Sequence, residues 1–86
     1  MAEEEIGVIN HYFSKIGVAV VELTKGELHV GETVHIKGTT TDLMQEVESM
    51  QKEHESLETA QQGDSIGMKV LDHVRQHDKV YKVVEE

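Results

Sequence analysis

One stretch of the chain decides the fold: residues 26–38 read GELHVGETVHIKG. Apolar and polar residues alternate on both sides of a central glycine, which is typical of two half-buried strands joined by a tight turn. The alternation predicts that Val34 and Ile36 face the interior of the protein. It also predicts that His35 and Lys37 face outward. A further glycine at each end marks where the chain turns again.

The same pattern extends outward from this stretch in both directions. Residues 6–13 and 16–23 are rich in β-branched residues, as are residues 66–70 and 80–84. There is no proline, and the seven glycines are spread along the 86 residues. These features predict an all-β fold, a small antiparallel β-barrel of about six strands. We expect one domain over residues 1–86, with an ordered core from about residue 6 to about residue 84.

The middle of the chain, residues 42–62, supports two interpretations. Its composition of Glu, Gln, Lys, Met and Leu favours a helix, and its apolar positions recur at helical spacing. The alternative is a strand followed by a loop, because tertiary contacts often override local propensity. The residues of the helical stripe are Leu43, Val47, Met50, His54 and Leu57.

Three stretches carry a resemblance to a known family. Residues 16–21 with 26–38, residues 47–50 (VESM) and residues 60–67 (AQQGDSIG) occur in the order found in the second domain of translation GTPases such as elongation factor Tu. The chain resembles small stand-alone translation elongation factor-like proteins, which consist of this barrel alone. The resemblance implies a strand over residues 42–50 and a loop over residues 51–62 with at most one helical turn. The GTPase activity of that family belongs to a different domain.

The resemblance also identifies an interior and two turn glycines. Gly31 and Gly63 would sit at tight turns that favour a positive φ, and Gly67 where a neighbouring backbone comes close. The predicted interior residues are Leu28, Val30, Val34, Ile36, Val47, Ile66, Met68 and Val70.

No reaction centre is evident in the sequence. The chain has no cysteine and no phosphate-binding loop of the Gly-x-x-x-x-Gly-Lys-Ser/Thr type. His73 and His77, flanked by Asp72 and Asp78, are the best metal candidates, but on a strand and turn their imidazoles would not share a face. The remaining candidates are two serine–histidine pairs without a nucleophile motif, Ser14 with His11 and Ser49 with His54. We therefore expect no enzyme activity, no cofactor and no bound metal.

The net charge of −9 limits the possible partners. It disfavours DNA, membranes and a broad RNA-binding face, because phosphate groups are repelled. RNA contact stays possible only locally, through cationic residues near the C-terminus. No apolar stretch approaches a membrane span or a signal peptide, and the absence of cysteine suits a reducing compartment, so we expect a cytoplasmic protein. Those cationic residues are Lys69, Arg75, Lys79 and Lys82.

Aromatic residues mark the candidate partner-binding site. Tyr12 and Phe13 lie beside His11 and Lys15, at the tip of the first predicted hairpin. Such residues can anchor a protein partner or stack on a base, although one or both rings could instead close an end of the barrel. The sequence thus predicts a non-enzymatic binding module for a protein or ribonucleoprotein partner. The alternatives are a direct tRNA or rRNA binder, or an accessory barrel for a separately encoded enzyme such as a peptidase, since a similar barrel is appended to some peptidases.

Overall fold

The computed structural model describes residues 2–84 and confirms an all-β domain with antiparallel pairing. It contains ten strands rather than the predicted six or so. Throughout residues 2–84 there is no helix, and therefore none that could span a membrane. The strands are β1 (Ala2–Phe13), β2 (Val18–Leu23), β3 (Glu27–His29), β4 (Thr33–Lys37), β5 (Asp42–Glu46), β6 (Met50–Lys52), β7 (Glu55–Leu57), β8 (Thr59–Gln61), β9 (Ser65–Lys69) and β10 (Lys79–Val84).

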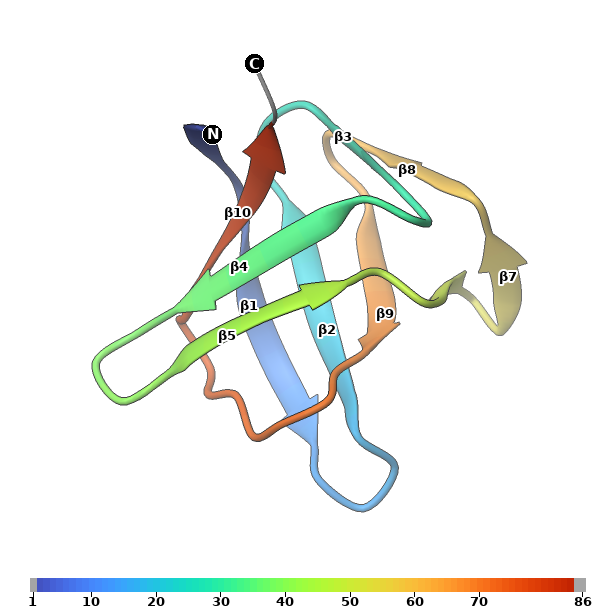
Figure 1. Cartoon of the computed structure of the whole chain (residues 1–86). Coiled ribbons are helices and arrows are strands. Elements are labelled where there is room, and N and C mark those ends of the chain that lie inside the picture. The colour runs from blue at the N-terminus through green and yellow to red at the C-terminus, as the bar shows by residue number, and fades with distance from the viewer. Residues whose placement is uncertain (1, 85–86) are drawn as a thin grey trace.

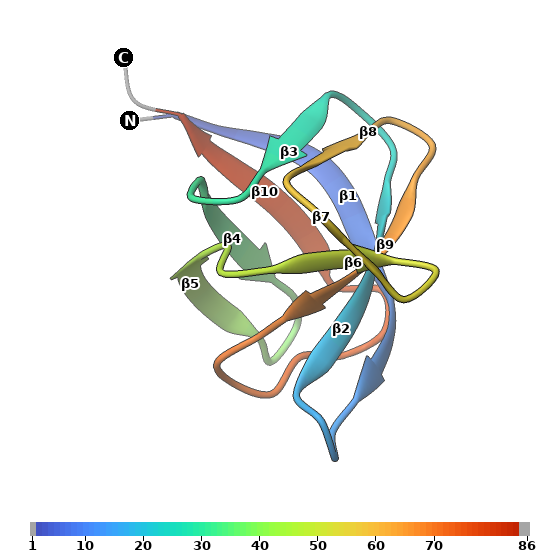
Figure 2. The same cartoon turned by 90° about the vertical axis from the view of Figure 1, so that its right-hand side faces the viewer.

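The strands form one large sheet and one small one. The large sheet has the order β5-β4-β10-β1-β2-β9-β6-β7, and β3 pairs with β8 in the two-stranded sheet. The large sheet curls, so that β4 and β5 lie in front of β1, β2 and β9 (Figure 1; Figure 2 shows the view from the side). Within residues 2–84 no ladder joins β5 to β7, so backbone hydrogen bonds do not close this sheet into the predicted barrel.

The core lies between the layers of the curled sheet. Seven of the eight predicted interior residues are buried, including Val34 and Ile36. The prediction for Val30 is wrong: this side chain is 40% exposed, because β3 ends at His29 and Val30 begins the turn. The prediction that His35 is solvent-facing is also corrected, since two carboxylates cover it (described below). The buried apolar residues are Ile6, Ile9, Ala19, Val21, Leu23, Leu28, Val34, Ile36, Val47, Met50, Ala60, Ile66, Met68, Val70, Val74 and Val80.

Residues 42–62 form strands rather than a helix. β5 pairs with β4, and β6 pairs with β9, so neighbouring strands supply the hydrogen bonds that a helix would have made internally. The loop predicted over residues 51–62 is also wrong, because this segment contains a hairpin and β8. The hairpin turns at Glu53 and His54, whose φ angles are 52° and 67°. Two central residues with positive φ are typical of a tight hairpin turn that matches the twist of the strands.

Glycine is required where the chain turns sharply or strands approach closely. Gly31 and Gly63 have φ angles of 97° and 94°, which confirms the predicted conformation. Gly7 lies at an irregularity of β1, and a Cβ there would sit 2.4 Å from the carbonyl oxygen of Glu22 on β2. β1 can therefore pair with both β10 and β2 only with a bare backbone at this position.

The two ends of the described chain lie together. Ala2 pairs with Val84 at one end of the molecule, whose longest dimension is 35 Å. The tip of the β1–β2 hairpin lies at the opposite end (Figure 1). These two ends differ in the residues they expose, and the candidate site lies at the end with the hairpin tip.

Candidate docking surface at the hairpin end

The hairpin end is formed by residues 10–19 and residues 67–77, two segments far apart in the sequence. The first makes the tip of the β1–β2 hairpin, and the second leaves β9 and runs past it (Figure 1). The amide of Val70 donates to the carbonyl of Gly17 at 2.9 Å, which continues the β2–β9 ladder beyond its last pair. The two segments are therefore fixed against each other by backbone as well as by side chains.

The structure separates the four residues predicted for partner binding. The rings of His11 and Phe13 lie together edge to face, with centroids 4.5 Å apart, and Phe13 is 46% exposed. Lys15 is exposed in the turn. Tyr12 points to the other face of the strand, where it packs against the core and lies 4.8 Å from the ring of His73. Tyr12 thus helps to hold the hairpin end together, whereas Phe13 faces solvent.

Two apolar residues of this end were not among the predicted site residues. Ile16 is 66% exposed and Leu71 is 63% exposed. Ile16 was expected within a strand over residues 16–23, but β2 begins only at Val18 and Ile16 lies in the turn. Val18 pairs with Lys69, and the Val70 amide bonds the Gly17 carbonyl, so the pairing of β2 with β9 brings the two segments that carry Ile16 and Leu71 to the same end of the molecule.

A buried glutamine fixes the position of Leu71. The amide of Leu71 donates to Oε1 of Gln45 at 2.8 Å, and Nε2 of Gln45 donates to the carbonyl of Lys69 at 2.9 Å. Gln45 is buried, so both bonds are shielded from competing water. This side chain joins β5 to the segment after β9, where the sheet has no backbone ladder.

The surface of the hairpin end is hollowed rather than flat. A shallow hollow of about 490 Å³ is lined by His11, Tyr12, Ser14 and residues 73–76. A second one of about 290 Å³ is lined by residues 12–16. Both are open to solvent and both border Tyr12 and Ser14, so together they make one uneven surface around the hairpin tip.

The charge of this end differs from that of the rest of the molecule. Residues 10–19 and 67–77 hold three of the eight lysine and arginine residues and three of the six histidines, but one of the seventeen acidic residues. The remaining residues carry the other sixteen acids and are strongly negative. These two segments therefore carry more basic than acidic residues, unlike the rest of this acidic protein. Their charged and titratable residues are Lys15, Lys69, Arg75, His11, His73, His77 and Asp72.

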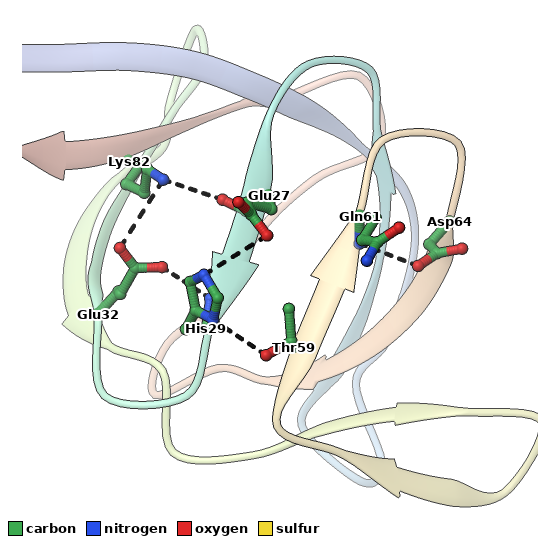
Figure 3. A network of polar contacts seen from close by, with 7 residues as sticks. All are labelled: Glu27, His29, Glu32, Thr59, Gln61, Asp64 and Lys82. Carbon is green, nitrogen blue, oxygen red and sulfur yellow. Dashed lines mark hydrogen bonds and ion pairs between the residues drawn. The ribbon is translucent and has the colours of Figure 1, made fainter.

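The opposite end, near the chain termini, is a network of polar contacts (Figure 3). Lys82 Nζ donates to the carbonyl of Glu27 at 3.0 Å and lies 3.8 Å from Glu32. Glu32 Oε1 accepts the amide of His29 at 2.7 Å, and His29 Nδ1 is hydrogen-bonded to Thr59 Oγ1 at 3.0 Å. We call this the polar end, defined by Glu27, His29, Glu32, Thr59, Gln61, Asp64 and Lys82.

The turn before β9 belongs to the same network. Asp64 accepts the amide of Gln61 at 2.9 Å and an ion-pair hydrogen bond from Lys52 at 2.8 Å. Lys52, and then the Gln61 amide, lower the pKa of Asp64. These contacts hold the small β3–β8 sheet in place, and the side chains that make them are already occupied. The polar end is therefore a structural feature and a weak candidate for binding.

His35 is a buried histidine, a residue type that can act as a general base. His35 lies on the outer face of β4 and is 9% exposed, with Nδ1 2.8 Å from Glu3 and Nε2 hydrogen-bonded to Asp42. Asp42 first, and then Glu3, raise the pKa of His35. Because a carboxylate occupies each ring nitrogen, neither nitrogen is available to take a proton from a substrate. The three groups form an ionic clamp between β1, β4 and β5.

The other catalytic and metal candidates are not assembled. Within residues 2–84 there is no cluster of three His, Cys, Asp or Glu side chains placed to hold a metal ion. Asp72 accepts the amide of His73 at 2.7 Å, and Asp78 accepts the amide of Arg75 at 2.8 Å. Both carboxylates thus serve turns of the segment between β9 and β10.

The geometry defines a small β domain with an exposed apolar and cationic end. Proteins similar to this chain in sequence carry peptidase names. The chain is 42% identical over 72 residues to a collagenase of Porphyromonas gingivalis, covering 83% of this chain and 20% of the collagenase. It is 39% identical over 82 residues to an uncharacterized protease of Methanocaldococcus jannaschii, covering 94% of this chain and 20% of that protein. No family model matches the sequence.

The similar solved structures also come from a protein with a peptidase name. The C-terminal domain of a Geobacillus thermoleovorans protein assigned to the U32 peptidases matches with a TM-score of 0.86 and 20% sequence identity, covering 94% of this chain and 93% of that domain. A selenomethionine variant of that domain matches with a TM-score of 0.83. At this identity the likeness shows the fold alone. The chain thus has the fold of a peptidase C-terminal domain and spans about a fifth of the curated relatives it matches.

These comparisons correct the resemblance to translation factors. The similar proteins are named as peptidases and the similar structures are C-terminal domains of a U32 peptidase, so the assignment to the translation elongation factor-like proteins is wrong. They give no support to an RNA or ribonucleoprotein partner. Of the alternatives drawn from the sequence they favour the last, an accessory barrel for a separately encoded enzyme such as a peptidase, although in both relatives the matching segment is part of the same chain as the rest of the named protein.

Proposed function

We propose that this chain is a non-catalytic accessory domain of a U32-type peptidase, and that it contributes binding rather than chemistry. One observation carries the proposal: the chain matches a collagenase at 42% identity, but over only 20% of the length of that enzyme. A segment of that size leaves four fifths of the relative to supply the reaction centre. We propose the same non-catalytic role for this chain.

The side chains of the domain support a role without catalysis. The buried histidine, His35, has a carboxylate on each ring nitrogen, so both nitrogens are occupied by structural contacts. The serine–histidine candidates Ser14 with His11 and Ser49 with His54 show no hydrogen bond to each other among the described residues. A hydrolase would need a nucleophile within hydrogen-bond reach of its base. The proposal includes a cytoplasmic location, which the absence of cysteine supports.

The test exchanges this chain with the matching segment of the collagenase. We would delete the matching 72 residues from the Porphyromonas gingivalis enzyme, and in a second variant replace them with this chain. Hydrolysis of gelatin and of a short peptide would be measured for the intact enzyme, both variants and this chain alone. We expect the deletion to reduce turnover of gelatin far more than that of the short peptide, because a binding domain contributes to long substrates.

The expected result for the replacement is recovery of gelatin hydrolysis to within a few-fold of the intact enzyme, with no hydrolysis by this chain alone. Hydrolysis by this chain alone would show that it is an enzyme. Equal loss of activity on both substrates, not restored by this chain, would show that the segment only stabilises its own enzyme. Either result would overturn the proposal.

A further inference from the structure

We propose that the hairpin end is a docking site for a separate polypeptide segment that combines acidic and apolar side chains, an inference that rests on the proposed function. Three exposed side chains, Phe13, Ile16 and Leu71, would provide the apolar contact. Lys15 and Arg75 would provide the charge at its rim.

The apolar residues are concentrated at this end. Five large hydrophobic side chains of the described chain are exposed, and three of them fall within residues 10–19 and 67–77. Exposed apolar residues scattered singly need no explanation, whereas a cluster with a polar rim is typical of an interaction surface. The five exposed residues are Phe13, Ile16, Val30, Met44 and Leu71.

The cluster is held in place before any partner arrives. Gln45 bonds the backbone of Leu71, and the amide of Gly17 donates to the carbonyl of Phe13 at 2.9 Å across the turn that carries Ile16. The ring of His11 packs against that of Phe13. Little conformational entropy is then lost when a partner binds, which favours a surface of modest size.

Charge decides which class of partner fits. An acidic segment would be repelled by most of this protein, whose net charge is −9, and attracted only by the two segments that carry Lys15, Lys69 and Arg75. The same charges could attract a nucleic acid. However, binding of single strands relies on several stacking rings, and here Tyr12 is packed against the core, which leaves Phe13. A polypeptide therefore fits this surface better than RNA.

The surface lies at the end of the domain opposite the described termini. Ala2 and Val84 pair at the end opposite the hairpin tip (Figure 1). The hairpin tip is therefore remote from both ends of the described chain, and a polypeptide could reach it without contacting them.

The test uses the 86-residue chain and a defined probe, a random copolymer of glutamate and tyrosine, with polyglutamate for comparison. Fluorescence anisotropy at about 50 mM and about 300 mM salt would give the affinities. We expect this acidic protein to bind the acidic copolymer and to bind polyglutamate at least about tenfold more weakly, because the apolar contact is missing. Lys15→Gln with Arg75→Gln should weaken binding and reduce its salt dependence.

A matched pair of variants locates the contact. Ile16→Ser with Leu71→Ser should raise the Kd for the copolymer at least about tenfold. Val30→Ser removes an apolar side chain that is 40% exposed near the polar end, and should leave the Kd unchanged. Circular dichroism of each variant would establish that it is folded. Equal binding by the Ile16 and Leu71 variant, or an equal loss in Val30→Ser, would overturn the inference.

Two other outcomes would assign the surface to a different occupant and also overturn it. One is tighter binding of tRNA than of the copolymer, lost in the Ile16 and Leu71 variant. The other is self-association in size-exclusion chromatography that this variant abolishes. The proposed function is tested apart from this, because a working collagenase replacement with no copolymer binding would remove only the docking inference. Copolymer binding with an inactive replacement would remove only the accessory role.

Discussion

The two ends of this domain use similar residue types in opposite ways. At the polar end, Glu32 and Lys82 bond to the protein itself, and His29 is held between Thr59 and Glu27 (Figure 3). At the hairpin end, backbone bonds and Gln45 provide the support, so the side chains are left exposed. The difference shows that the stabilising contacts and the candidate binding contacts of this small domain are spatially separate.

The short length of β3 and β8 explains why the polar end needs hydrogen bonds and ion pairs between side chains. β3 and β8 have three residues each, and an isolated two-stranded sheet of this length is not stable in water. The Lys82 side chain connects this sheet to β10, and the turn at Asp64 connects it to β9. The β1–β2 hairpin instead extends a large sheet, so its tip needs no polar contacts between side chains to hold its shape.

The largest effect is expected in the core that both ends share. Val34→Asp places a charge at a fully buried position without a partner, which costs more than about 4 kcal/mol. A domain of this size has a total stability of about 5–10 kcal/mol, so the variant should be largely unfolded. Far-ultraviolet circular dichroism and thermal melting would measure this. The control is Val30→Asp, the same change at an exposed valine, which should melt close to the unmodified chain.

A smaller effect is expected from breaking the polar end alone. Glu32→Ala removes the carboxylate that accepts the amide of His29, which costs about 1–2 kcal/mol. The melting temperature should fall by about 4–8 °C for each kcal/mol in a domain of this size. Glu48→Ala, the loss of an equal charge at an exposed position, is the control. If both variants melt alike, the network of Figure 3 does not stabilise the fold.

The ionic clamp at His35 predicts that the stability of the domain depends on pH. The pKa of His35 is raised from 6.5, so its contribution is complete below pH 6.5 and is lost as the pH rises through the folded value. The pKa values of Glu3 and Asp42 are lowered from 4.5 and 3.8, so their contribution is complete above those values and is lost in acid. The clamp should therefore stabilise the domain most between about pH 4.5 and about pH 6.5.

Urea unfolding from about pH 5.5 to about pH 8.5 would measure this contribution. The unmodified chain should lose stability over this range, and His35→Gln should lose much less. His11→Gln removes an exposed histidine and should keep the pH dependence of the unmodified chain. Equal pH dependence in the two variants would show that His35 is not the group responsible.

The fold could be predicted from the sequence where it depends on the pattern of residues within a single strand. Strict alternation in residues 33–37 was sufficient to identify Val34 and Ile36 as buried, because strand period alone decides which face a side chain takes. The number of strands was not predictable in this way. The strands of this part of the chain are interrupted at residues 47–49 and again at Glu53 and His54. Glu53 and His54 have positive φ angles although neither is glycine, so the sequence carries no signal for this turn.

The candidate site was predictable only in part. Its location at the hairpin tip follows from the aromatic residues, and strand alternation alone could have separated Tyr12 from Phe13. Leu71 could not be predicted as part of this end, because it follows Ile16 by 55 residues and only the pairing of β2 with β9 places its segment beside the hairpin. The family assignment failed for a related reason: glycine turns between short strands specify a shape, and proteins of different function share that shape.

The smallest effect on stability is expected at the hairpin end. This prediction tests most directly whether the two ends of the domain differ in their contribution to stability. Leu71→Ser should change the free energy of unfolding by less than about 0.5 kcal/mol, because this side chain is already in water. Val70→Ser, one residue earlier in the same segment, removes a buried side chain and should cost about 2 kcal/mol or more. Urea unfolding of the two variants under identical conditions would measure the difference. If Leu71→Ser is as destabilised as Val70→Ser, Leu71 serves the core and is not available to a partner.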